Sequence, residues 1–195
     1  MKQKSRYIWT MYQAVIDSLQ SFGTFSEKDL SFFESKLSAR AVRKNDFVLK
    51  EKGLCQAIYF LLDGSCIHML PSANGTDTVV NLYTKHSWLT DYQSFTSQKP
   101  SVAFIQAFED CQLAVLEIHA LHELIQYSPI FFKAGKLLEM MQYTDITSLT
   151  LSPEERYRDL IDRRPELLQT FPLKILASYL RITPETLSRI RKRIQ

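Results

Sequence analysis

Hydrophobic residues near the start of the chain recur at helical spacing. From residue 8 to about residue 19 they share one face of a helical wheel, the members being Ile8, Met11, Tyr12, Val15, Ile16 and Leu19. A second helix is predicted to begin at Ser26, with Leu30 and Phe33 on its apolar face. The chain is therefore expected to open with two helices.

Between about Ser38 and Glu117 the pattern changes to short runs of β-branched and aromatic residues, which are typical of strands. The runs are FVL (47–49), IYFLL (58–62), CIHML (66–70), TVVNLY (78–83), VAFIQAF (102–108) and LAVLEI (113–118). The dipeptides Asp63-Gly64 and Asn74-Gly75 lie between runs, and their residues tolerate the positive φ of tight hairpin turns. This pattern predicts an antiparallel sandwich or jelly roll.

A short helix and then a long one are expected after the strands. HALHELIQ (119–126) suits the short helix, and Ser128 and Pro129 supply a cap and a first-turn proline for the long one. The long helix carries an apolar stripe of Ile130, Ala134, Leu137, Leu138 and Met141, with Phe131 and Phe132 beside it. A helix this apolar must be buried, either against its copy in a second chain or against its own β domain. We expect the helix to pack against its copy in a homodimer. Packing against its own β domain stays open as the alternative.

A capping box predicts a further helix start at Ser152-Pro153-Glu154-Glu155, where Ser152 and Glu155 satisfy each other's backbone amides. The preceding segment TSLTLSP (147–153) is the expected domain boundary.

Two short helices are predicted at the end of the chain. Pro172 fits a first-turn position, and an apolar stripe follows at helical spacing, consisting of Leu173, Leu176, Ala177 and Leu180. After a tight turn at Arg181-Ile182, Thr183 can cap the next helix and Pro184 can begin it. The buried stripe of that helix consists of Leu187, Ile190 and Ile194, and its opposite face carries Glu185, Ser188, Arg189 and Lys192, with Arg193 at the edge.

This basic helix allows three interpretations. A helix-turn-helix needs a first helix that braces a second, whose exposed face enters the DNA major groove. An ordinary solvated helix also carries charges, and a basic amphipathic helix can lie on a membrane. The membrane interpretation is disfavoured because the apolar stripe of this helix is narrow and lacks Trp and Phe.

Composition fits a soluble globular protein, with 45% hydrophobic and 23% charged residues. The net charge is only +3, but positive charge is concentrated at the end of the chain. In the last fifteen residues the single acidic residue is Glu185, and the basic residues are Arg181, Arg189, Arg191, Lys192 and Arg193. Because no apolar run is long enough to span a bilayer and no signal-peptide core is present, we expect a cytoplasmic protein without a membrane partner.

A metal-dependent enzyme is the second class to consider, because jelly rolls also host metal sites. The candidate ligands are His68, His86, His119 and His122, but no HxH strand motif with a following Glu supports such a site. The cysteines Cys55, Cys66 and Cys111 are odd in number, widely spaced and without a CxxC. We predict them to be core residues, and we expect no enzymatic activity, cofactor or metal.

The order of these parts resembles the Crp/Fnr family of bacterial transcription regulators over nearly the whole chain. The most specific match is ILASYLRITPETLSRIRK (175–192), which is similar to the family's helix-turn-helix with its Glu-Thr pair followed by Arg-Ile. The segment FVLKEKGLCQAIYFLLDGSC (47–66), with Gly53 and Gly64, resembles the family's β-roll.

The resemblance implies roles for individual residues and partners. Base contacts fall on Glu185 and Arg189 and a phosphate contact on Thr186, with Ser188, Lys192, Arg193 and Arg181 as further DNA-binding candidates. It also implies a homodimer on double-stranded DNA, with recognition helices about 34 Å apart on a roughly palindromic operator. RNA polymerase and an unknown small-molecule effector are further candidate partners.

The sequence departs from the family at the effector site. Cyclic-nucleotide-binding members have a Gly-Glu pair followed by an Arg about ten residues on, which binds the phosphate. Here Leu89-Thr90 or Thr90-Asp91 stands at the first position, and Pro100, Ser101 or Val102 at the second. Cyclic AMP is therefore not expected to be the effector, and the candidate pocket consists of Thr90, Asp91, Lys99 and Ser101. Iron-sulfur sensing is disfavoured too, because it needs more cysteines than the three present.

The helix-turn-helix also departs from the family. Arg181 stands where Gly is common, and a left-handed non-Gly residue costs about 1 kcal/mol, so either the turn is built differently or Arg181 is kept for a phosphate. Pro184 replaces an often basic residue, and because the sequence ends at Gln195 we expect no β-hairpin wing. These departures leave open an alternative, a ligand-binding or protein-interaction module that has lost DNA binding.

The predicted fold class is α+β, with N-terminal helices, an antiparallel β-roll, a long dimerisation helix and an all-α C-terminal helix-turn-helix. The expected divisions are a cyclic-nucleotide-binding-like domain at 1–127, a dimerisation helix and hinge at 128–150, and a DNA-binding domain at 151–195.

Overall fold

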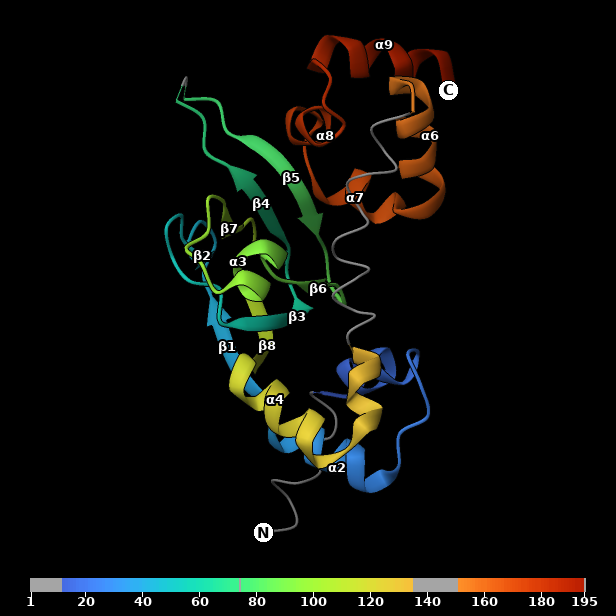
Figure 1. Ribbon diagram of the computed structural model, residues 1–195. Helices are drawn as coiled ribbons and strands as arrows, with labels where there is room; N and C mark the ends of the chain where they lie inside the picture. Colours follow the sequence, from blue (N-terminus) through green and yellow to red (C-terminus); the bar gives the residue numbers. More distant parts are fainter. Residues whose placement is uncertain (1–11, 74, 135–150, 195) are drawn as a thin grey trace.

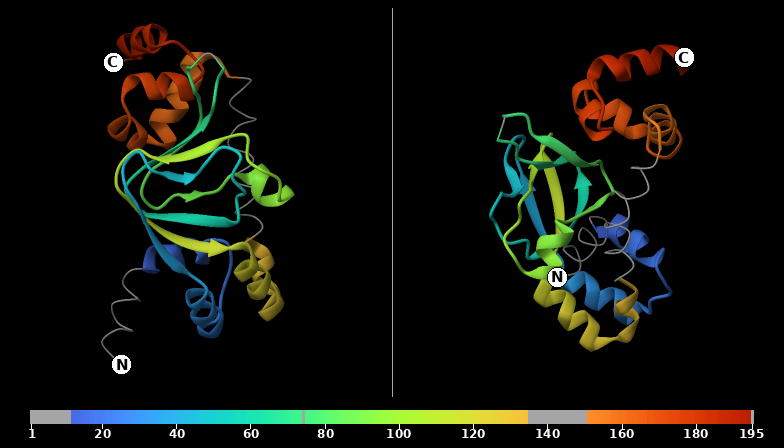
Figure 2. Two further views of the ribbon diagram at one scale, coloured as in Figure 1. Left: turned by 90° about the vertical axis from the view of Figure 1, so that its left-hand side faces the viewer. Right: turned by 45° about the horizontal axis from the view of Figure 1, so that its top comes forward.

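The structure is a computed structural model that describes residues 12–73, 75–134 and 151–194. A β-roll occupies the centre, with helices gathered at its two ends (Figure 1). Helix α4 and the N-terminal helices lie at one end, and α6–α9 lie at the other beside strand β5 (Figures 1 and 2). The predicted α+β class is therefore confirmed.

The N-terminal helices follow the predicted pattern. Residues 12–20 are helical, while residues 8–11 of the prediction lie outside the described residues. Helix α2 (Glu27–Ser35) begins after Ser26, whose side chain accepts from the Asp29 amide while Asp29 accepts from the Ser26 amide. This capping box explains why the helix begins where the sequence predicts.

Among the described residues, eight strands make up the β-roll, in two four-stranded sheets with the orders β1-β8-β3-β6 and β2-β7-β4-β5. The described pairs are all antiparallel. The strands are β1 (Ser38–Val42), β2 (Phe47–Leu49), β3 (Ala57–Asp63), β4 (Cys66–Leu70), β5 (Thr78–Tyr83), β6 (Trp88–Leu89), β7 (Phe104–Ala107) and β8 (Cys111–Glu117).

Alternate residues of β4 and β5 pack into two different cores. Cys66 and Tyr83, which pair across the strands, belong to the large core between the sheets. Their neighbours Ile67 and Leu82 point the other way, into a second core shared with the C-terminal helices. The outer face of this sheet is therefore an internal interface of the molecule.

Two elements follow the pattern less closely. Helix α3 (Tyr92–Ser97) was not predicted, whereas α4 (Ile118–Tyr127) was. Residues Pro129–Ala134 form a 3₁₀ helix, η1, rather than the predicted α-helical start, because the Phe131 amide bonds to Ser128 O in an i→i+3 pattern. Phe131 is buried against Phe25 and Phe33 instead of lying beside an apolar stripe. The remainder of the long helix, residues 135–150, lies outside the described residues.

Four helices form the C-terminal part, namely α6 (Pro153–Arg163), α7 (Pro165–Thr170), α8 (Leu173–Tyr179) and α9 (Pro184–Ile194). The predicted capping box between Ser152 and Glu155 is present at the start of α6. Helix α7 was not predicted, and Pro172 occupies the cap position of α8 rather than its first turn. The core between the helices consists of Tyr157, Leu160, Leu167, Phe171, Leu176, Ala177, Leu180, Leu187 and Ile190.

The C-terminal helices pack on β5 and its neighbours. The Val79 amide donates to the Ser178 hydroxyl of α8 at 3.1 Å, and the Arg164 guanidinium donates to Leu82 O at 2.7 Å. The rings of Phe108 and Phe171 lie with centroids 5.1 Å apart. Both parts of the chain are thus held together by apolar contacts and by hydrogen bonds.

Candidate functional site

The tight turn between α8 and α9 is built on Arg181. This residue adopts a left-handed conformation with φ 57°. The Arg181 amide donates to Ser178 O at 3.0 Å, and the Ile182 amide donates to Ala177 O at 3.0 Å. These two bonds make a complete Schellman motif, in which glycine is normally preferred at the left-handed position. The turn therefore has the geometry that favours glycine, although arginine stands there.

Arg181→Gly is expected to raise the free energy of unfolding of the C-terminal helices by about 1 kcal/mol, because glycine adopts this φ without steric cost. Urea unfolding followed by circular dichroism measures the change. Arg163→Gly is the matched control, since Arg163 lies within α6 and glycine should destabilise there by up to about 1 kcal/mol. Destabilisation by both substitutions would contradict the strain assigned to Arg181.

Helix α9 begins as the sequence predicts. The Thr183 hydroxyl accepts from the Thr186 amide at 3.2 Å and lies 3.1 Å from the Thr186 hydroxyl. The pKa of Glu185 is lowered, first because its own backbone amide donates to the carboxylate, and further because of Thr183 and nearby Arg189. Glu185 is therefore ionised at neutral pH and can act as a hydrogen-bond acceptor.

The two faces of α9 differ as predicted. Leu187 and Ile190 are each 1% exposed, while Ile194 is half-buried. On the other side Glu185, Arg189 and Lys192 are exposed. A helix held by such a stripe presents its charged side chains outward at fixed positions.

The remaining predicted residues lie around this face. Thr186 and Ser188 are half-buried, and Arg181 is exposed. Arg193 is exposed, and its guanidinium lies 3.8 Å from a carboxylate oxygen of Glu154 on α6. An exposed pair at this distance is weak, so it can be exchanged for another anion.

The second candidate site, the predicted effector pocket, is centred on Asp91. This buried carboxylate accepts from the Ser94 amide at 3.0 Å, which caps α3, and from the Ser101 hydroxyl. Ser101 lies ten residues further on, and its hydroxyl contacts Asp91 directly. Among the residues that the sequence offered, Asp91 and Ser101 are thus in contact, and their correspondence to the family's Glu and Arg stays a prediction.

Buried partners complete this cluster. The Thr90 hydroxyl donates to Ala57 O at 3.0 Å and lies 3.2 Å from Cys55 Sγ. His68 Nε2 on β4 lies 3.9 Å from Asp91 Oδ2, a proximity that the sequence did not reveal because the two residues are far apart in the chain. Lys99 is exposed and contributes only its carbonyl oxygen, which accepts from the Ser94 hydroxyl at 2.6 Å. The predicted residues other than Lys99 therefore come together in one buried polar cluster.

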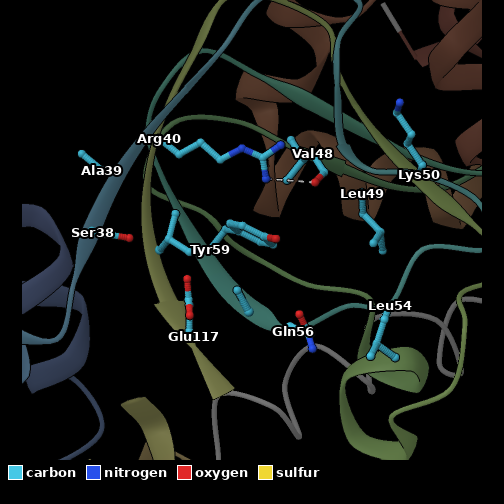
Figure 3. Close-up of a pocket in the computed structure, with 12 residues that line it drawn as sticks. Ser38, Ala39, Arg40, Val48, Leu49, Lys50, Leu54, Gln56, Tyr59 and Glu117 are labelled. Atoms are coloured by element: carbon cyan, nitrogen blue, oxygen red, sulfur yellow. Dashed lines mark hydrogen bonds between the residues drawn. The ribbon is translucent and has the colours of Figure 1, made fainter. Parts of the chain in front are cut away.

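A separate open groove of about 540 Å³ lies against β1, β3 and β8 (Figure 3). Arg40 lies across it, and its guanidinium donates to Val48 O at 3.1 Å and to Phe47 O at 3.0 Å. Tyr59 lines the groove, and burial raises the pKa of its phenol. Both terminal nitrogens of the Arg40 guanidinium already donate to carbonyl oxygens. Arg40 is therefore not available to bind a phosphate in a bidentate manner.

Within residues 12–73, 75–134 and 151–194, no three His, Cys, Asp or Glu side chains gather in a way that could hold a metal ion. None of the helices described there is long and apolar enough to cross a membrane.

Comparison with known proteins identifies the β-roll and the overall fold. Residues 39–128 match the family of cyclic nucleotide-binding domains, whereas no curated protein sequence matches the chain. Among solved structures, FixK2 from Bradyrhizobium japonicum has a TM-score of 0.64 at 13% identity, covering 81% of this chain and 84% of its own. The catabolite activator protein of Thermus thermophilus has a TM-score of 0.56 at 19% identity, covering 89% of this chain and 85% of its own.

A protein of the Crp/Fnr family from Eubacterium rectale has a TM-score of 0.59 at 12% identity, covering 88% of this chain and 84% of its own. The fold of this chain is therefore similar to that of these proteins, as the sequence resemblance to the Crp/Fnr family predicted. Within this fold, residues 39–128 match the family of cyclic nucleotide-binding domains.

Proposed function

We propose that this protein is a transcription regulator that binds double-stranded DNA in a sequence-specific manner through α9. The observation that carries the proposal is the arrangement of α9, in which Leu187 and Ile190 are buried while Arg189 and Lys192 are exposed. A helix fixed in this way after a tight turn is the geometry of a recognition helix. The Schellman turn and the Thr183 cap also fix where α9 begins, which supports the proposal.

Roles on DNA follow from chemistry and position. Arg189 is one turn from Glu185 on the exposed face, so both can reach base edges in one major groove, with Arg suited to guanine and Glu to a cytosine amino group. Thr186 and Ser188 have hydroxyls suited to phosphate or base edges, and Lys192, Arg193 and Arg181 carry charge for phosphates.

Dimerisation is part of the proposal. Two copies would place two α9 helices in successive major grooves about 34 Å apart, on a roughly palindromic operator. RNA polymerase is the proposed downstream partner. The apolar residues expected to join the copies fall mainly within 135–150, outside the described residues.

Arg189→Ala is expected to weaken binding to the preferred site by about 1–3 kcal/mol and to relax base preference there, because a bidentate base contact is lost. Lys192→Ala should weaken binding to all sequences and flatten the salt dependence, because a phosphate contact is lost. Fluorescence anisotropy at several salt concentrations, on the preferred and a scrambled duplex, measures both. Lys174→Ala, on the exposed side of α8, is the matched charge control. Identical effects of Arg189→Ala on both duplexes would contradict base readout.

Cyclic AMP and cyclic GMP are not expected to bind. A phosphate entering the cluster would meet the buried Asp91 carboxylate, and Ser101 rather than Arg stands opposite it. Ligand at about 100 times its Kd would stabilise the fold by about 2.7 kcal/mol, so a thermal-shift titration is a sensitive test. We expect no change in Tm, and a saturable rise with either nucleotide would contradict the prediction that cyclic nucleotides do not bind.

Selection from genomic fragments at physiological salt tests the proposed function. It should be run with and without a pool of small metabolites, so that DNA preference and effector dependence are read together. Enrichment of fragments sharing an imperfect palindrome is expected. Recovery of fragments in proportion to their input in both arms would instead favour a protein-interaction module without DNA binding.

A further inference from the structure

Cys66 and Cys111 bring two thiols together in the centre of the β-roll. Cys66 begins β4 of one sheet and Cys111 begins β8 of the other. Their sulfur atoms lie 3.6 Å apart, and both side chains are buried. The two residues are 45 positions apart in the chain, so only the fold brings them into contact.

The turn at Gly64 makes this approach possible. Gly64 has φ +90°, and a Cβ added there would lie 2.9 Å from Cys111 Sγ. The chain therefore passes directly against Cys111 before it enters β4 at Cys66. The Cys111 thiol lies 3.3 Å from Ser65 O and 3.2 Å from Glu109 O, which hold its sulfur beside that of Cys66.

We propose that Cys66 and Cys111 form a reversible intramolecular disulfide when the protein meets hydrogen peroxide. The chemistry does not depend on DNA binding. In a reducing compartment such bonds are transient and serve as redox sensors rather than as structural staples. A bond at this place would join the two sheets of the β-roll.

Cys111 is the thiol that reacts first. The hydrogen bond between the sulfurs lowers the pKa of Cys111, and the same hydrogen bond, together with burial, raises the pKa of Cys66. The Cys111 thiolate attacks one oxygen of hydrogen peroxide, and the O–O bond breaks to leave Cys111 as a sulfenic acid. The hydroxide that leaves takes up the proton that Cys111 has lost and becomes water.

Cys66 then attacks the Cys111 sulfur. The S–S bond forms, the S–O bond of the sulfenic acid breaks, and hydroxide leaves and takes up the Cys66 proton as water. In total two thiols and one hydrogen peroxide give one disulfide and two waters, with each sulfur giving one electron to the peroxide. Bond formation brings the sulfurs from 3.6 Å to about 2.0 Å, so the two side chains and the turn that precedes Cys66 must move toward each other.

The neighbouring contacts connect this pair to the C-terminal helices. Ser65 O accepts from the Phe108 amide at 2.8 Å, and the Phe108 ring packs against Phe171. A shift of the turn beside Cys66 is therefore transmitted to the contact between the β-roll and the C-terminal helices.

Mass spectrometry of the full-length chain tests the proposal. The reduced, folded protein is treated with hydrogen peroxide, free thiols are blocked with iodoacetamide, and peptides are analysed without reduction. We expect a cross-link between Cys66 and Cys111 within one chain and a fall from three free thiols to one, reversed by dithiothreitol. The Tm of the oxidised protein should rise by on the order of 5 °C, since a long loop is closed.

Cys55 provides the matched control, because it is equally buried but lies beside Thr90 rather than another cysteine. Cys55→Ala should leave the cross-link intact, and Cys66→Ala or Cys111→Ala should remove it. Circular dichroism checks that each variant is folded. If a variant does not fold, the cross-link measured in the wild-type protein still tests the proposal. Cross-links that involve Cys55 or two chains would overturn the proposal. So would a Cys66–Cys111 bond that forms only in urea, or oxidation to sulfinic acid without a cross-link.

Discussion

Gly64→Ala is expected to lower the free energy of unfolding by about 3 kcal/mol or more. Two costs add at this position. The backbone has φ +90°, which an L-residue adopts at a cost of about 1 kcal/mol. The added methyl group would also lie 2.3 Å from Asp110 O and 2.9 Å from Cys111 Sγ, so the turn or β8 must move. Urea unfolding followed by the fluorescence of Trp88, which lies in the same β-roll, measures the effect.

Gly75→Ala separates the two costs. Gly75 has φ +75°, but nothing lies within 4 Å of a Cβ added there. Only the conformational cost applies, so the free energy of unfolding of this variant should fall by about 1 kcal/mol. Equal losses in the two variants would show that the close approach of the turn to β8 contributes nothing.

Leu187→Ala is expected to lower the free energy of unfolding by about 2–5 kcal/mol. It should also abolish specific DNA binding at growth temperature. Leu187 is 1% exposed in a small core, where a cavity cannot be refilled by neighbouring side chains without moving α9. Since α9 carries the proposed base contacts, its loss of position removes binding without removing any contact residue. Far-UV circular dichroism in urea and fluorescence anisotropy on the preferred duplex measure the two effects.

Ile194→Ala is the control for this substitution. Ile194 lies on the same stripe at the end of α9 but is only half-buried, so the loss should be below about 1.5 kcal/mol with DNA binding retained. If both variants bind DNA like the wild type, burial of the stripe does not position the recognition face.

The sequence predicted those elements whose signals are local. Strands β4 and β5 were predicted with their observed bounds, because each is a short, largely apolar run that lies near a turn dipeptide. The α6 start was predicted because the Ser152–Glu155 capping box needs only four consecutive residues.

Elements defined by distant contacts were missed. Strand β1 is exposed over most of its length, so it shows no buried alternation, and it exists because it pairs with β8. Strand β6 has only two residues and is likewise defined by pairing, here with β3.

In the candidate sites too, features with local sequence signals were predictable and contacts between distant residues were not. The exposed face of α9 was predictable, because helical periodicity alone separates Arg189 from Leu187. The link between His68 and Asp91 was not, because it joins β4 to the start of α3 across the core. Contact between Cys66 and Cys111 was equally hidden, since their spacing matches no motif and depends on the packing of two sheets.

Sequence-specific regulation requires that α9 reads base sequence. The direct measurement is the ratio of Kd values on a scrambled duplex and on the duplex recovered by genomic selection, taken at physiological salt. We expect the recovered duplex to bind about 10³-fold more tightly or better, with Arg189→Ala reducing that ratio and Lys192→Ala preserving it. A ratio near one, with binding that simply weakens as salt rises, would contradict the claim and leave α9 as a non-specific basic surface.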